Sequence, residues 1–241
     1  MSKFAETVSQ TTTQSNDSAP PVKVFEETLW PARVAYLHAN FNPKSIKLPF
    51  VYHFGDCECG DPCKLESCRN ARMDIFCTDK CCIREELCAN RPRESANIKV
   101  MREEKSGQYA LVAIAPVKRG DVLGEYLGQL RCVETDPAKR SRNQGFLLQM
   151  RVRTAGVRER CVGIDALHLG GRMRFANHSC VANAEFYEVA NGRRHTIVVV
   201  STENILPGKE VTVNYGKDLW FVCGCKHTKC VHRNIQDQED P

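Results

Sequence analysis

The sequence lacks any run of about 18 apolar residues, the length that a helix needs to cross a bilayer, so we expect no membrane span. Its first residues, MSKFAETVSQ, have neither the apolar core nor the small-residue cleavage site of a signal peptide. Internal repeats are absent, as is the alternation of strands with long helices that a doubly wound sheet requires. We therefore expect a chain that stays in a reducing compartment, where disulfides are rare.

A strong excess of charge of one sign is also absent. Lys and Arg number 34 against 29 Asp and Glu, which gives a formal net charge of +5. This mild excess permits a nucleic acid or another acidic partner without requiring one. Hydrophobic residues make up 42% of the chain, enough to bury a core.

Cysteine, by contrast, is abundant, with 14 in 241 residues. Eight of them lie between residues 57 and 88, in a segment with few large apolar side chains. Cysteines a few residues apart can converge on one tetrahedral zinc ion, whereas a disulfide across the spacing Cys57-x-Cys59 would be strained. The segment therefore predicts two zinc ions, bound either by four thiolates each or by seven with one shared, and a disulfide framework is the less favoured reading.

A second, smaller cluster follows near the C-terminus, with the pattern Cys223-Gly224-Cys225-x4-Cys230. Three thiolates leave a tetrahedral zinc ion one ligand short. His227 inside the loop and the distant Cys180 are the two candidates for the fourth ligand, and the spacing does not decide between them.

From about residue 98 the sequence predicts a mainly β domain of short strands separated by turn residues. The dipeptide Asn191-Gly192 between two alternating runs predicts a hairpin. The expected strands span 111–115, 122–127, 146–152, 161–164, 185–189, 196–201 and 211–214. One short helix is expected over 136–143. Apolar residues at helical spacing from Phe25 to Phe41 predict another, with Pro31 in its first turn.

Four sequence blocks carry a family resemblance. They are FANHSCVAN at 175–183, LPGKEVTVNYG at 206–216, GEYLGQL at 124–130 and the C-x-C-x4-C pattern that ends at Cys230. Together they resemble the SET-domain protein lysine methyltransferases, over roughly residues 57–232. The cysteine-rich segment at 57–88 resembles the AWS pre-SET motif, which accompanies SET enzymes that act on lysine 36 of histone H3.

The resemblance implies a β-clip fold of small curved sheets in which the segments 177–183 and 210–216 form a pseudoknot, flanked by zinc-binding segments. The implied divisions are a disordered tail (1–24), an N-terminal helical arm (25–50), an AWS segment (51–95), the SET catalytic domain (96–216), a post-SET segment (217–232) and an acidic tail (233–241).

The resemblance also implies S-adenosylmethionine as the methyl donor and assigns roles to individual residues. The expected catalytic residues are Tyr215, which matches the family's catalytic tyrosine, together with Tyr126 and Phe146. The expected cofactor-binding residues are Gln108, Tyr109, Phe146, Asn177, His178 and Phe221. Gln108 and Ala110 stand where the family often has glycines, and this departure alters the cofactor loop.

Three zinc ions are implied. AWS motifs hold two with seven cysteines, and the cysteine that matches their bridging ligand is Cys63. In post-SET proteins the fourth ligand comes from the Asn-His-Ser-Cys block, which is Cys180 here. Either Cys81 or Cys82 fits the remaining AWS position, and Cys82 is taken as the ligand. The expected ligands are Cys57, Cys59, Cys63, Cys68, Cys77, Cys82, Cys88, Cys180, Cys223, Cys225 and Cys230.

The function that the resemblance implies is methylation of a histone lysine, with lysine 36 of H3 on nucleosomes as the leading target. Another histone or non-histone lysine is the first alternative, and a zinc-stabilised chromatin-binding module with weak catalysis is the second. Expected partners are the H3 tail, the nucleosome and, through the basic region 139–174, nucleosomal DNA. The protein is expected to be a monomer in the nucleus, on chromatin.

Overall fold

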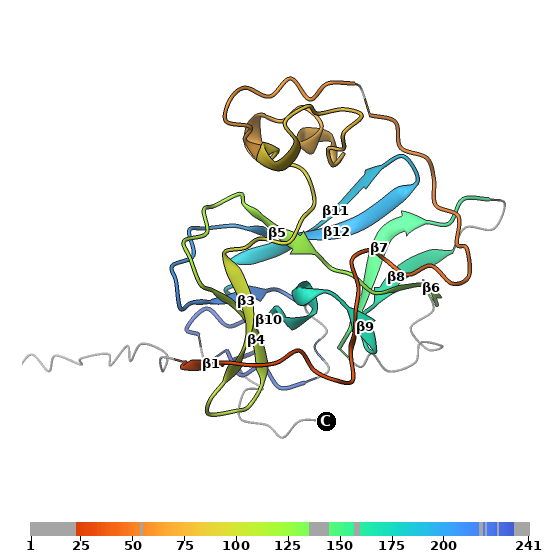
Figure 1. The fold of residues 1–241 in the computed structure, drawn as a ribbon. Coiled ribbons are helices and arrows are strands. Elements are labelled where there is room, and N and C mark those ends of the chain that lie inside the picture. The colour runs from red at the N-terminus through yellow and green to blue at the C-terminus, as the bar shows by residue number, and fades with distance from the viewer. Residues whose placement is uncertain are drawn as a thin grey trace, which may run out of the picture.

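The computed structural model describes residues 23–53, 55–134, 145–156, 160–216, 219, 221–225 and 227–233. Over these residues the chain is mainly β, as the sequence predicts (Figure 1). Its strands are β1 (Phe25–Glu27), β2 (Ala35–Tyr36), β3 (Ile98–Glu103), β4 (Tyr109–Ala113), β5 (Val122–Glu125), β6 (Gln129–Val133), β7 (Leu147–Arg153), β8 (Cys161–Asp165), β9 (Leu169–Gly170), β10 (Asn177–His178), β11 (Ala184–Asn191), β12 (Arg194–Ser201) and β13 (Glu210–Val213).

The described helices are all single 3-10 turns: η1 (Leu65–Ser67), η2 (Ala71–Met73), η3 (Glu85–Leu87) and η5 (Arg172–Phe175). None of the described helices has the length and apolar character that crossing a bilayer would need.

The strands form four small sheets. One has the order β1-β3-β4-β13-β10, a second β11-β12-β5 and a third β6-β8-β7, while β2 and β9 pair by themselves. All seven predicted strands form, with ends that differ by up to two residues from the expected ones. The predicted hairpin also forms, because Gly192 adopts the positive φ of 61° that its tight turn requires.

The helix expected over 25–41 is wrong. Residues Phe25–Glu27 pair antiparallel with β3, and Ala35–Tyr36 pair in parallel with β9. The apolar residues of this stretch do not share one buried face, since Val34 is buried while the side chain of Leu29 is 87% exposed. The backbone N–H and C=O groups of this stretch therefore bond to the open edges of two sheets, whereas in a helix they would bond to one another.

The main core lies between the sheets and consists of β-branched and aliphatic side chains from most strands. Its fully buried members include Leu111, Leu123, Ile164, Val199 and Val211. Tyr126 and Phe175 belong to the same core, and Tyr109, Phe146 and Tyr215 pack against it. The residues expected to act in catalysis therefore border a rigid, apolar interior.

The cysteine-rich segment lies over the hairpin of β11 and β12 (Figure 1). Phe76 anchors it there: its ring is buried with Val189, Val198 and Val200, and its N–H donates to Ala190 O at 3.3 Å. The Asn191 amide donates to Phe76 O at 2.8 Å. The hairpin thus fixes the cysteine-rich segment to the sheet of β11, β12 and β5.

Several expected features lie outside the described residues. They are the helix at 136–143, nearly all of the tails at 1–24 and 233–241, and parts of the basic region 139–174.

Candidate functional site

Two of the motif blocks meet in one parallel strand pair. In β10, Asn177 pairs with Thr212 and His178 pairs with Val213 of β13, and Ser179 N–H donates to Val213 O at 3.0 Å. On its other side β13 pairs antiparallel with β4. This strand pair therefore places the Asn-His-Ser-Cys block next to the start of the Asn-Tyr-Gly block.

Tyr215 lies directly beyond this strand pair. Its hydroxyl donates to Ala176 O at 2.8 Å, and its backbone N–H donates to His178 Nδ1 at 3.1 Å. Burial, assisted by the Glu210 carboxylate and opposed by Arg174, raises the pKa of Tyr215 to about 12. The phenol is therefore neutral at physiological pH and keeps its proton for hydrogen bonding.

Tyr126 and Phe146 lie beside each other, and Phe146 also contacts Arg174. The Tyr126 hydroxyl donates to Phe146 O at 2.8 Å, and burial raises the pKa of this tyrosine as well. The Arg174 guanidinium lies 4.2 Å from the centre of the Phe146 ring, and its Nε donates to Ala166 O at 2.9 Å. Arg174 is only 8% exposed, and its guanidinium also lies 4.7 Å from the centre of the Phe175 ring, so it is a buried cation between two aromatic rings.

Asn177 is held from two directions. Its amide nitrogen donates to Tyr109 O at 3.0 Å and to Glu210 Oε1 at 2.8 Å. The other carboxylate oxygen, Oε2, lies 2.7 Å from Lys23 Nζ. Both N–H bonds of the amide are thus committed, and its oxygen is the remaining polar atom with which Asn177 can recognise a ligand.

Two aromatic rings pack beside the ring of His178. Its centroid lies 5.5 Å from that of Tyr215 and 5.9 Å from that of Phe221, and these two rings are 6.2 Å apart. Burial, together with the nearby His232, lowers the pKa of His178 to about 4, so its ring is neutral.

The two loop residues expected to bind the cofactor, Gln108 and Tyr109, differ in how far they are buried. Gln108 is exposed just before β4. The half-buried Tyr109 ring lies 5.4 Å from the ring of Phe175. The structure therefore brings together Tyr109, Asn177, His178, Tyr215 and Phe221, and it joins Tyr126 and Phe146 to them through Arg174.

Sequence reasoning assigned no role to Arg174, Glu210 or Lys23. Arg174 could have been noticed, because it is a charged residue between the buried Met173 and Phe175, whereas Glu210 follows four exposed residues. Lys23 gave no local signal, since its partner Glu210 lies 187 residues away in the sequence.

The C-terminal thiols converge with Cys180. The ligand atoms of Cys180, Cys223, Cys225 and Cys230 lie within 4.8 Å of one another, and the Cys180 sulfur lies 3.7 Å from that of Cys223 and 3.5 Å from that of Cys230. Zinc–sulfur bonds of about 2.3 Å imply sulfur–sulfur edges of about 3.8 Å in a tetrahedron. The four thiols therefore suit zinc, with Cys180 in the group and His227 outside it.

The N-terminal thiols form two overlapping groups. One contains Cys57, Cys77 and Cys82, and the other Cys57, Cys59 and Cys68. Cys57 is thus the shared member, whereas the family resemblance implied that Cys63 bridges. Two backbone hydrogen bonds hold Cys57 between the two halves of the segment, from its N–H to Cys81 O and from Arg69 N–H to its carbonyl.

The neighbouring thiols have distinct places. The Cys82 sulfur belongs to the group with Cys57 and Cys77. The Cys81 sulfur instead accepts a hydrogen bond from the Thr78 N–H at 3.3 Å and contacts the Asn191 amide at 3.6 Å. Cys63 contacts Cys59, and Cys88 contacts Cys77, so each lies beside one of the groups. None of the fourteen cysteines, all of which fall in the described part of the chain, forms a disulfide.

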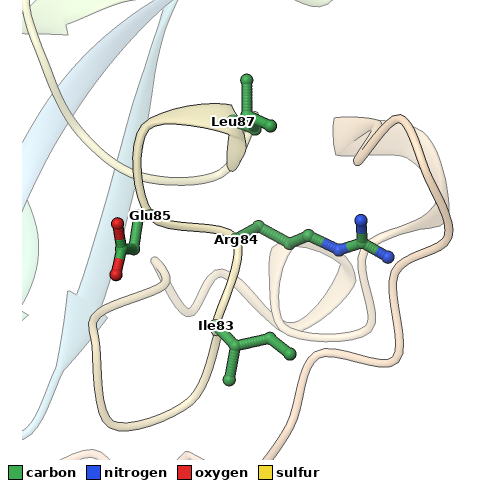
Figure 2. Close-up of a pocket in the computed structure, with 4 residues that line it drawn as sticks. All are labelled: Ile83, Arg84, Glu85 and Leu87. Carbon is green, nitrogen blue, oxygen red and sulfur yellow. The ribbon is translucent and has the colours of Figure 1, made fainter.

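A separate hollow lies on the surface of the cysteine-rich segment. It is lined by Ile83 and Arg84 and by Glu85 and Leu87 of η3, which follows them directly (Figure 2). Ile83 is 83% exposed and Leu87 71% exposed. None of the residues expected to bind cofactor or to act in catalysis lines it.

Comparison with known proteins shows what this arrangement is similar to. Residues 108–216 match the model of the SET domain family. A histone-lysine N-methyltransferase, H3 lysine-36 specific, of Cryptococcus neoformans var. neoformans serotype D is 31% identical over 198 residues, which cover 73% of this chain and 22% of that protein. Histone-lysine N-methyltransferase ASHH2 of Arabidopsis thaliana is 25% identical over 81% of this chain and 11% of its own length. The chain thus spans about a fifth or less of these relatives.

Solved structures share the fold. KRYPTONITE in complex with mCHG DNA and SAH superposes with a TM-score of 0.60 at 22% identity, over 83% of this chain and 47% of that one. The methyltransferase domain of human histone-lysine N-methyltransferase SETMAR superposes with a TM-score of 0.59 at 17% identity, over 86% of this chain and 91% of that one. The mainly β arrangement described above is the fold of these proteins.

Proposed function

From the premise that this chain carries a SET domain homologous to the H3 lysine-36-specific methyltransferases, we propose that it methylates a lysine side chain, with S-adenosylmethionine as donor and lysine 36 of histone H3 as target. One observation carries the proposal: the pairing of Asn177 and His178 with β13 sets a neutral, hydrogen-bonded Tyr215 beside them.

The chemistry requires a neutral amine at the moment of attack. Free lysine has a pKa near 10.4, so only about a thousandth is deprotonated near neutral pH. We place the lysine channel between Tyr126, Phe146 and Tyr215, whose packing in or against the core would disfavour the ammonium through desolvation. The donor, when bound, supplies a methyl group on a sulfonium cation. The protein's own part is to orient the two partners, which makes the attack effectively unimolecular.

Individual residues divide this task. The Tyr215 hydroxyl, fixed on Ala176 O, orients the amine, and the Tyr126 hydroxyl is held on Phe146 O at the channel wall. The Asn177 oxygen and the backbone of His178 are the polar groups that hold the donor. Tyr109 and Phe221 border the donor as apolar walls, with Gln108 at the exposed entrance.

Zinc has a structural part in this proposal. The C-terminal thiols, as a post-SET segment, hold one ion, and the cysteine-rich segment, as an AWS motif, holds two through Cys57, Cys59, Cys63, Cys68, Cys77, Cys82 and Cys88. Because Cys180 belongs to the catalytic domain, its ion ties the segment after Tyr215 back onto the site.

The proposed partners are the histone tail and the nucleosome, and the proposed location is nuclear chromatin. A solved KRYPTONITE structure that shares this fold, with a TM-score of 0.54, holds an H3 peptide and DNA. In the described part of the basic region, Arg174 is buried and Arg172 is paired with Glu94, so neither is suited to phosphate. Arg151 also pairs with Asp74 and Glu188, but its side chain is 74% exposed, so it is more accessible to DNA.

A second candidate function is a zinc-stabilised chromatin-binding module. The observation that favours it is the cofactor loop, where Gln108 and Ala110 replace small, close-packing glycines of the family pattern. Calorimetric titration with S-adenosylmethionine, paired with transfer of labelled methyl to recombinant nucleosomes, separates the two. Binding with transfer supports the enzyme, whereas a folded, zinc-loaded protein that neither binds the donor nor transfers methyl supports the module.

A further inference from the structure

The His178 ring lies between the C-terminal thiol group and Tyr215. On one side its Nδ1 is 3.1 Å from the Tyr215 backbone nitrogen. On the other, its Nε2 is 3.4 Å from the sulfur of Cys180. The same side chain therefore touches the residue proposed to orient the substrate amine and a residue proposed to bind zinc.

The direction of these two contacts fixes the position of the ring proton. A backbone N–H can only donate, so Nδ1 must accept from Tyr215 and carries no proton. In a neutral imidazole the proton then resides on Nε2, which faces the Cys180 sulfur. A zinc-bound cysteine is a thiolate, and a thiolate accepts such a hydrogen bond. With its proton on Nε2, His178 would donate to Cys180 and would not bind the metal, although its ring atom lies within 4.8 Å of ligand atoms of Cys180, Cys223 and His232.

We infer that His178 is a positioning residue that couples occupancy of the C-terminal zinc site to the placement of Tyr215. The zinc-held thiolate of Cys180 fixes the Nε2–H end of the ring, and the Nδ1 end then fixes the backbone of Tyr215. Donors that bond metal-ligating atoms commonly change metal affinity by about 10- to 100-fold, so the coupling also acts in the opposite direction.

The packing around the ring supports a rigid link. Tyr215 and Phe221 contact the ring, and Cys223 follows Phe221 by two residues. Two described residues, Tyr215 and Phe221, thus hold the ring in place near the thiol group. Loss of the zinc-bound thiolate would remove the acceptor of Nε2–H and loosen the ring.

Two substitutions separate the two ends of the ring. In His178→Gln the amide nitrogen can take the place of Nε2 and still donate to Cys180, but Tyr215 N–H loses its acceptor. In His178→Asn the amide oxygen can take the place of Nδ1 and still accept from Tyr215, but Cys180 loses its donor. His227→Ala is a matched control, because this histidine is in the same C-terminal segment but outside the thiol group.

The test uses the full chain and two readouts that do not involve methyl transfer: zinc affinity of the C-terminal site, by competition with a chelator, and hydrogen exchange of the Tyr215 amide by NMR. We expect His178→Asn to lower zinc affinity about 10- to 100-fold and His178→Gln to remove protection of the Tyr215 amide while zinc affinity stays within a few fold. Zinc removal from the parent chain should also lower that protection, and His227→Ala should change neither quantity.

The ring itself gives a direct signature. The ¹⁵N spectrum of the zinc-loaded protein should show the Nε2–H tautomer of His178. An Nδ1–H tautomer, or equal loss of both readouts in the Asn and Gln variants, would overturn the coupling and leave His178 with a packing role. The inference rests on the proposed function only in assigning Tyr215 to the substrate, and these measurements can fail while methyl transfer is intact.

Discussion

The amide nitrogen of Asn177 lies 2.8 Å from the carboxylate of Glu210, and the Glu210 side chain is only 9% exposed. A nearly buried carboxylate thus holds the asparagine that we propose to contact the methyl donor. The second oxygen of the same carboxylate binds Lys23, from the segment that precedes β1. The orientation of Asn177 is therefore a product of tertiary structure and not of its own strand alone.

Glu210→Ala should weaken the binding of S-adenosylmethionine about 10- to 100-fold. The reason is that Asn177 loses a charge-assisted hydrogen bond, which contributes about 1.5–3 kcal/mol. Lys23→Ala should have an effect of under about 1 kcal/mol, since Lys23 is half exposed and such pairs contribute little. Calorimetric Kd values for the two variants check this, and parent-like binding by Glu210→Ala would show that Asn177 needs no such support.

Tyr215→Phe should lower the rate of methyl transfer about 100- to 1,000-fold, the usual cost of losing one hydrogen-bonding group that acts on the reacting atoms. Stability should fall by only about 1 kcal/mol, the typical net contribution of one hydrogen bond such as that from this hydroxyl to Ala176 O. Tyr36→Phe is the control: it removes a hydroxyl that is bonded to Glu94, a residue with no proposed role in the reaction, and it should keep its rate. A Tyr215→Phe enzyme with parent activity would contradict the assigned role.

Cys82→Ala and Cys81→Ala should differ sharply although the residues are adjacent. Cys82 belongs to a thiol group, so its loss should remove zinc from the cysteine-rich segment and lower Tm. Cys81 accepts hydrogen bonds from Thr78 and Asn191 instead, so its variant should bind as much zinc as the parent. Atomic emission spectroscopy of the purified proteins gives the ratio of zinc to protein. Loss of zinc in Cys81→Ala but not in Cys82→Ala would show that Cys81 is the ligand.

Gly128→Ala should destabilise the fold severely or prevent it. A Cβ atom at residue 128 would lie 2.5 Å from the backbone oxygen of Asp165, which cannot move without breaking the pairing of β6 with β8. Gly60→Ala is the matched control, because nothing lies within 4 Å of its added Cβ. Thermal unfolding of both variants measures the difference, and equal Tm values would mean that the close approach at residue 128 is relaxed in solution.

The strands could be predicted from the sequence because their β-branched residues face a common core, as in the fully buried run around Val199. The N-terminal arm could not, since Phe25–Glu27 is extended only because β3 offers it an open edge. Local apolar spacing carries no information about that edge.

The candidate site also has features that the sequence could predict and features that it could not. The Asn-His-Ser-Cys and Asn-Tyr-Gly blocks were visible in the sequence, and so was the need of the C-terminal thiols for a fourth donor. The ion pair of Lys23 with Glu210 depends on register between distant segments. The shared position of Cys57 depends on the path of an irregular loop, which thiol spacing does not determine.

The most direct test of the proposed function is transfer of labelled methyl from S-adenosylmethionine to recombinant nucleosomes that carry histone H3 with lysine 36 either intact or replaced by alanine. We expect labelled H3 with the intact substrate, and loss of the label when lysine 36 is replaced or when the enzyme carries Tyr215→Phe. Equal labelling of both nucleosomes would contradict the assigned target, and no labelling by folded, zinc-loaded protein would contradict the assigned activity.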